Sequence, residues 1–200
     1  FFNSYAQSDD KKWAVGVNFS SIIFSGEGIN KVKDRRNSQF PTFQLSKYIG
    51  NQFSIDLSYT SETIKSLNTV NEFNYSSVDA YLRYNLPEIF LKVVPFGGVG
   101  LGYIEGASTT PDPKSVISLN FMVGGTLWMS DRFGLSSRFI YKNVSASSLS
   151  MASHLQITAG VIYAFNFNSS GAGMPPKRAG KTVILVPYTI SLVISTSVNT

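Results

Sequence analysis

Residues 53 to 59 read Phe53-Ser54-Ile55-Asp56-Leu57-Ser58-Tyr59, an unbroken alternation of large apolar and polar residues. A second segment repeats the alternation as Ser77-Val78-Asp79-Ala80-Tyr81-Leu82-Arg83-Tyr84. Successive side chains of a β-strand point to opposite faces, whereas the pattern of an amphipathic helix repeats about every 3.6 residues. Both segments are therefore predicted to be strands with one apolar and one polar face.

The composition indicates that much of the surface does not face water. Charged residues make up only 14% of the 200 residues and aromatic residues another 14%, although a soluble domain normally carries more surface charge. The chain lacks a run of the roughly 18 apolar residues that a membrane-spanning helix needs. A closed β-barrel is the other structure that satisfies every backbone hydrogen-bonding group in lipid.

The alternation recurs along the chain and predicts an even number of strands, as single-chain bacterial barrels have. The predicted strands cover residues 12–24, 41–49, 53–60, 74–84, 93–104, 116–129, 133–144 and 153–166. Long and short connections alternate between them, as external loops and periplasmic turns do in outer-membrane barrels. We therefore predict an all-β fold, an eight-stranded antiparallel up-and-down transmembrane β-barrel in the bacterial outer membrane.

The predicted barrel spans residues 7–166 and is flanked by segments of different composition. Ser4-Tyr5-Ala6 matches a small-x-small cleavage site, so residues 1–6 are interpreted as the remnant of an export signal peptide. Residues 167–181 are rich in Gly, Pro and basic residues, which indicates a linker. Residues 182–200 are β-branched and apolar, and they are predicted to be a short β-prone or disordered tail.

Aromatic residues gather at the strand ends that the predicted topology places on the periplasmic side. They are Trp13, Phe53, Tyr84, Trp128, Phe133, Tyr163 and Phe165. Membrane proteins place Trp and Tyr at the lipid–water interface, so these residues are predicted to form an aromatic belt. A soluble β-sandwich also has short alternating strands, but it does not sort its aromatic residues in this way.

The polar positions of the strands are predicted to face the barrel interior. Charged side chains there need partners, because an isolated buried charge is costly. The predicted lumen ion-pair network comprises Asp56, Asp79, Tyr81, Arg83, Arg138 and Lys142. Glycines on the same face leave room for these side chains, at Gly98, Gly100, Gly102 and Gly124. Two interpretations stay open, a structural network and a gate or ion path.

Other kinds of chemistry find little support in the sequence. The chain has no cysteine and one histidine, which excludes thiolate chemistry and disfavours a zinc site, so no cofactor and no metal are predicted. Ser153 and His154 invite a lipid-hydrolase hypothesis, but neighbours on a strand point to opposite faces. The net charge of +5 is too dispersed for a nucleic-acid partner.

The one dense basic cluster lies in the longest predicted external loop. It consists of Lys31, Lys33, Arg35 and Arg36. Basic side chains at that place are candidates for contact with lipopolysaccharide phosphates, and a solvated loop is the alternative.

The last predicted strand reads Thr158-Ala159-Gly160-Val161-Ile162-Tyr163-Ala164-Phe165 and resembles the assembly signal of outer-membrane barrels. Val94-Pro95-Phe96-Gly97-Gly98-Val99-Gly100-Leu101-Gly102-Tyr103 and Ser130-Asp131-Arg132-Phe133-Gly134-Leu135 resemble the fifth strand and last turn of the OmpA-type N-terminal outer-membrane β-barrel family. The resemblance covers about residues 12–166. It implies that the barrel assembly machinery reads Thr158, Gly160, Tyr163 and Phe165.

The resemblance further implies a non-enzymatic protein that anchors or supports the cell envelope. Its expected partners are outer-membrane lipid, lipopolysaccharide and the barrel assembly machinery, with other envelope proteins reached through the external loops. An alternative hypothesis is a small barrel of the OmpW type that passes small or apolar solutes. A lipid-modifying enzyme that uses His154 is a third hypothesis.

Overall fold

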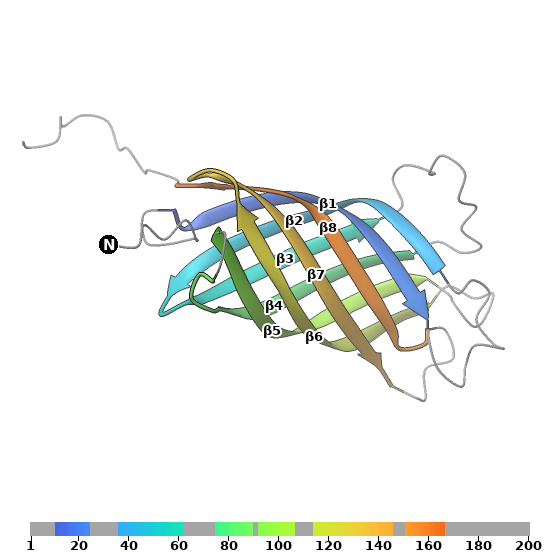
Figure 1. Cartoon of the computed structure of the whole chain (residues 1–200). Helices are drawn as coiled ribbons and strands as arrows, with labels where there is room; N and C mark the ends of the chain where they lie inside the picture. Colours follow the sequence, from blue (N-terminus) through green and yellow to red (C-terminus); the bar gives the residue numbers. More distant parts are fainter. Residues whose placement is uncertain are drawn as a thin grey trace, which may run out of the picture. The chain divides into compact units, whose positions relative to one another are not determined.

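The described part of the chain folds into a closed barrel of eight antiparallel strands in the computed structural model (Figure 1). The structure describes residues 11–24, 36–61, 75–89, 92–106, 114–145 and 151–166. The strands are β1 (Trp13–Phe24), β2 (Arg36–Gly50), β3 (Phe53–Ser61), β4 (Tyr75–Asn85), β5 (Val93–Gly106), β6 (Lys114–Trp128), β7 (Phe133–Val144) and β8 (His154–Phe165). Each strand pairs with the next, and β8 closes the barrel on β1. The predicted fold class is confirmed.

The short connections lie at one end of the barrel, which we call the turn end; the opposite end is the loop end (Figure 1). Between β2 and β3 the chain turns at Gly50, whose φ of 103° favours glycine. Between β6 and β7 the backbone N–H of Met129 donates to the Phe133 carbonyl at 3.0 Å. No helix among the described residues is long and apolar enough to cross a membrane.

Strand β2 begins at Arg36, five residues before the predicted start at residue 41. Pro41 lacks a backbone N–H, and proline inside a strand is normally confined to an edge, the first residue or a bulge. In the structure, residues 40 and 41 of β2 lie opposite the single residue Phe19 of β1, where the pairing register shifts. A β-bulge accommodates a proline inside a strand, so the polar residues before it can pair as well.

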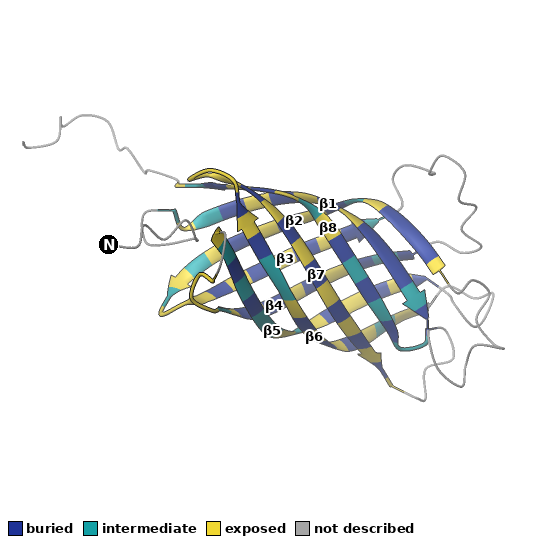
Figure 2. Cartoon of the chain, viewed as in Figure 1, coloured by how far each residue is buried: buried dark blue, intermediate teal, exposed yellow. Residues whose placement is uncertain are grey.

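The two faces of the strands differ as the alternation predicts (Figure 2). Ile55 and Leu82 are 44% and 47% exposed on the outer wall. Asp56 is 0% exposed and lies inside the barrel. Exposed apolar and buried ionic side chains are the reverse of a soluble protein, and they match a wall that faces hydrocarbon.

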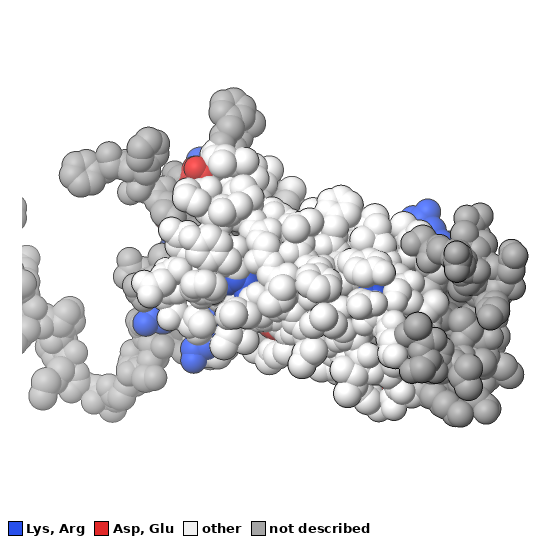
Figure 3. Space-filling model, turned by 90° about the horizontal axis from the view of Figure 1, so that it is seen from below, with Lys and Arg blue, Asp and Glu red and all other residues white. Residues whose placement is uncertain are grey.

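Charge is confined to the ends of the outer wall. The exposed charged side chains that the structure describes on the strands are Arg36, Lys47 and Glu105, and each lies near an end of its strand. Figure 3 shows the same distribution, with a mostly white wall and Lys and Arg atoms mainly toward the two ends. A band without charge between two polar rims fits a bilayer core.

The aromatic belt at the turn end is present, but Trp128 does not belong to it. Phe53 and Tyr84 are exposed on neighbouring strands, with ring centroids 5.0 Å apart. The Nζ atom of Lys47 lies 5.0 Å from the centroid of the Trp13 ring. Trp128 is 3% exposed and packs inside the barrel with Ala14, Val94, Ile162 and Ala164. The assignment of Trp128 to the interface belt was therefore wrong.

Candidate functional site: the polar interior of the barrel

The barrel interior gathers nearly all charge that is buried in the described residues. All six residues predicted for the lumen point inward, and each is at most 3% exposed. They come from β3, β4 and β7, and they form two groups rather than one network. We call these groups the Asp56 cluster and the Asp79 cluster.

The Asp56 cluster lies toward the turn end and comprises Ser46, Asp56, Arg83 and Arg138. Arg83 Nη1 donates to Asp56 Oδ2 at 3.0 Å, and Arg138 Nη1 lies 3.9 Å from the same oxygen. The hydroxyl of Ser46 donates to the other carboxylate oxygen. Side chains from β2, β4 and β7 therefore meet on one carboxylate of β3, which joins distant parts of the wall across the lumen.

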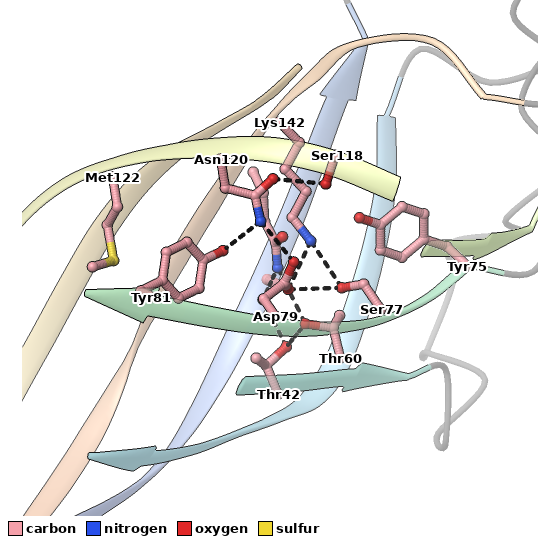
Figure 4. A network of polar contacts seen from close by, with 12 residues as sticks. Thr42, Thr60, Tyr75, Ser77, Asp79, Tyr81, Ser118, Asn120, Met122 and Lys142 are labelled. Carbon is pink, nitrogen blue, oxygen red and sulfur yellow. Dashed lines mark hydrogen bonds and ion pairs between the residues drawn. The ribbon is translucent and has the colours of Figure 1, made fainter. Parts of the chain in front are cut away.

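The Asp79 cluster lies closer to the loop end and comprises Ser77, Asp79, Asn120 and Lys142 (Figure 4). Lys142 Nζ donates to Asp79 Oδ2 at 2.8 Å and to Ser77 Oγ at 2.9 Å. Asn120 Nδ2 donates to Asp79 Oδ1 at 2.9 Å. The same amide lies 3.3 Å from the hydroxyl of Tyr81. Asp79 thus has partners on both oxygens, which compensates its removal from water.

Apolar side chains fill the interior beside the two ionic clusters. They form one group at the turn end, one in the middle and one at the loop end. The middle group consists of Tyr81, Phe96, Met122 and Ile140. It contacts both ionic clusters, because the Arg83 guanidinium lies 4.9 Å from the Phe96 ring centroid and Asn120 donates to Tyr81.

A third polar group, made of uncharged side chains, lies beside the Asp79 cluster, where Thr60 of β3 pairs with Ser77 of β4. Thr42 Oγ1 lies 2.7 Å from Ser20 Oγ and 3.3 Å from Thr60 Oγ1. Gln156 Nε2 donates to Ser20 and Thr60 at 3.2 Å each. This ring of hydrogen bonds links β1, β2, β3 and β8, so the strands at the closure of the barrel are connected by side chains as well as by backbone.

The space left by the lumen glycines is occupied by neighbouring side chains. A Cβ atom added at Gly100 would lie 2.6 Å from Cδ1 of Tyr81. One added at Gly102 would lie 2.7 Å from Ser118 Oγ and 2.8 Å from Asn120 Nδ2. Gly100 and Gly102 therefore leave space for the Tyr81 ring and the Asn120 amide to pack against the inner side of β5.

Sequence reasoning missed several members of the interior. Ser77 and Asn120 occupy the same alternating positions as the ions they contact, so periodicity was a sufficient signal for them. Phe96, Met122 and Ile140 are apolar, and the rule that polar residues face the lumen did not identify them. An interior with mixed chemistry has no single residue type that marks it.

His154 and Ser153 do not form a nucleophile and base. His154 is buried, its Nδ1 donates to the Ala152 carbonyl at 2.9 Å, and its Nε2 lies 3.0 Å from the Tyr75 hydroxyl oxygen. The Ser153 hydroxyl instead accepts from the backbone N–H of Val144 at 2.9 Å. Both side chains therefore have structural partners other than each other; His154 begins β8, and Ser153 lies just before it.

The other predicted sites lie on the surface or outside the described residues. In β8, Thr158 points inward, whereas Tyr163 is exposed and stacks on Phe165 with centroids 6.3 Å apart. Arg36 is exposed at the loop end, and its Nε donates to Ser21 Oγ at 3.0 Å. Lys31, Lys33 and Arg35 lie outside the described residues, as do the predicted segments 1–6, 167–181 and 182–200.

No protein-family model matches the chain, and no curated protein matches it. Solved structures do. Neisserial surface protein A is 17% identical with a TM-score of 0.53, and the match covers 76% of this chain and 97% of that one. The outer membrane protein OprG from Pseudomonas aeruginosa is 11% identical with a TM-score of 0.56, covering 78% and 97%.

The N-terminal β-barrel domain of OprF from Pseudomonas aeruginosa is similar as well, at 13% identity and a TM-score of 0.50, with 76% and 97% of the two chains covered. These identities are low, so the likeness concerns the fold. It is consistent with the outer-membrane location expected from the sequence. The chain has the fold of the eight-stranded outer-membrane β-barrels, and its apolar outer wall and ionic interior agree with that fold.

Proposed function

We propose that the protein is a non-enzymatic outer-membrane barrel of OmpA type, which serves as a membrane anchor and structural component of the cell envelope. The observation that carries this proposal is the filled interior, in which two ionic clusters contact a packed apolar group. The interior of an eight-stranded barrel is normally just wide enough for side chains. A barrel that is filled in this way can anchor the protein stably in the membrane.

The interior also argues against free passage of solutes. Arg83 and Lys142 are each held by a buried carboxylate, at 3.0 and 2.8 Å. Separating such pairs leaves uncompensated charge in a medium of low dielectric constant, which is costly. A solute would have to displace these contacts and the neighbouring aromatic rings.

The proposed partners follow from the two surfaces of the barrel. The apolar outer wall fits outer-membrane lipid, and exposed Arg36 at the loop end, with its basic neighbours in the sequence, fits lipopolysaccharide phosphates. The last strand is proposed to be read by the barrel assembly machinery. The external loops are proposed to contact other envelope proteins.

Conductance separates this proposal from the alternative, an OmpW-type barrel that passes small or apolar solutes. The purified chain, inserted into a planar bilayer, is expected to show only the background current. A Tyr81→Ala/Phe96→Ala variant removes two rings of the middle group and serves as the positive control, because opening this group should raise the current. Steady channels in the unchanged protein would contradict the anchoring role.

An enzymatic role is tested separately with His154→Ala. The non-enzymatic proposal expects the outer-membrane lipid profile of cells that make the variant to match that of cells with the unchanged protein. A lipid species that disappears with His154→Ala, while the variant stays folded in the membrane, would support the lipid-modifying hypothesis instead.

A further inference from the structure

The guanidinium of Arg138 has one edge that the Asp56 cluster does not use. The side chain is 3% exposed, and its Nη1 lies 3.9 Å from Asp56 Oδ2 and 4.0 Å from Met122 Sδ. Its Nε and Nη2 are buried, and no atom of the described residues accepts a hydrogen bond from either. These two N–H groups form the edge with which arginine binds carboxylates and other oxyanions side by side.

The buried charges of the interior do not cancel. Among the described residues the buried Lys and Arg side chains are Arg83, Arg138 and Lys142, and the buried acidic ones are Asp56 and Asp79. Lys142 Nζ lies 2.8 Å from Asp79 Oδ2, and Arg83 Nη1 lies 3.0 Å from Asp56 Oδ2. One positive charge is left over, and it belongs to Arg138, whose distance to Asp56 is the longest of the three.

The strand neighbours of Arg138 do not neutralise it. Its partners in the barrel wall are Gly124 on β6 and Thr158 on β8, and neither carries a charge. A water molecule would accept a hydrogen bond from the free edge but would leave the charge in place. An anion provides the acceptors and the compensating charge together, and burial makes that compensation valuable.

We propose that the edge of Arg138 formed by Nε and Nη2 binds a small monovalent anion inside the barrel. The single surplus charge calls for one negative charge, and the narrow lumen calls for a small ion. Nitrate, a short carboxylate and chloride each accept two adjacent hydrogen bonds. Such an anion would be a structural component of the folded barrel, and it would stabilise this state by mass action because the unfolded chain lacks the site.

Thermal unfolding of the full chain in phospholipid vesicles tests the proposal. Nitrate is the probe, and gluconate, a bulkier anion, is the comparison at equal sodium concentration. We expect nitrate to raise the unfolding midpoint of the unchanged protein by about 2–5 °C relative to gluconate. General effects of the salts on burial act on every variant, so only the difference between variants is diagnostic.

Three substitutions locate the effect. Arg138→Gln removes the charge and the binding edge, leaves Asp56 paired with Arg83, and should abolish the nitrate shift. Arg138→Lys keeps the charge without the paired N–H groups and should retain less than half of the shift. Arg132→Gln removes an exposed arginine at the turn end and should retain all of it.

Crystals of the full chain grown in sodium bromide give an independent readout. We expect an anomalous peak within hydrogen-bonding distance of Arg138 Nε and Nη2, and its loss in Arg138→Lys crystals. The same difference in midpoint between nitrate and gluconate in the unchanged protein and in Arg138→Gln, or a bromide map without a peak at this edge, would each overturn the proposal. If Arg138→Gln does not fold, Arg138→Lys and the bromide map decide.

Discussion

At the scale of single residues, the lumen salt bridge between Lys142 and Asp79 should be essential only as a pair. Lys142→Met leaves Asp79 buried without its cation, and we expect a loss of about 3–5 kcal/mol in the free energy of unfolding. Replacing both partners, as Lys142→Met/Asp79→Asn, should restore most of that loss. Urea unfolding in vesicles, followed by tryptophan fluorescence, measures each value.

The matched comparison is the double variant against the single one. If Lys142→Met/Asp79→Asn is no more stable than Lys142→Met, the cost does not come from an uncompensated carboxylate. The pair would then contribute to the free energy of unfolding through the packing of the methylene groups of its side chains.

Glycines on the two faces of β5 should respond differently to the same added methyl group. Gly102→Ala places a Cβ within 2.8 Å of Asn120 Nδ2, in the Asp79 cluster. A Cβ added at Gly97 would contact only the Met122 carbonyl oxygen, at 3.7 Å. We expect Gly102→Ala to cost about 1–3 kcal/mol of unfolding free energy and Gly97→Ala to be nearly neutral. Equal effects in the same urea titration would contradict the inward placement of Gly102.

At the scale of the strands, the lipid-facing wall should show a depth-dependent penalty for charge. Leu57 is the central residue of β3 and is 46% exposed, and Ile49 near the end of β2 is 50% exposed. In a bilayer, Leu57→Arg should cost about 2–4 kcal/mol, and Ile49→Arg at most about 1 kcal/mol. Urea unfolding of each variant in vesicles measures these two changes in unfolding free energy. In a soluble protein neither substitution of an exposed residue would matter, so two neutral variants would refute the membrane assignment.

The strands also show where local patterns stop being informative. The inward positions of β6 toward the turn end are Met122, Gly124, Thr126 and Trp128. Their chemistry is mixed, and Gly124 has no side chain, so this segment lacks the contrast between polar and apolar faces. Trp128 was therefore assigned from its place at a strand end, and the prediction failed. In β3, where every second residue is polar, each face was predicted correctly.

At the scale of the whole molecule, closure of β8 on β1 should suffice to hold the barrel. The pairing runs from Trp13 opposite Phe165 to Phe24 opposite His154. The backbone N–H of Lys12 donates to Asn166 Oδ1 at 2.9 Å. We expect a chain that ends at residue 166 to fold into vesicles with an unchanged unfolding midpoint, because every strand pairing is retained.

The heat-dependent shift in electrophoretic mobility of a folded barrel provides the readout. A chain that ends at residue 159 is the control, since it lacks the half of β8 that pairs with the start of β1 and leaves an open edge in lipid. Loss of the mobility shift in the chain that ends at residue 166 would mean that residues 167–200 contribute to the barrel. This result would contradict the predicted linker and tail.

The amino-acid sequence alone determined the barrel class, the number of strands and the faces of the well-alternating strands, because a period of two is a local property of the backbone. Only the tertiary structure decided which lumen charges meet. Lys142 and Asp79 are 63 positions apart, and Arg138 reaches Asp56 across the lumen. Such contacts depend on the register and closure of all the strands, which no local pattern encodes.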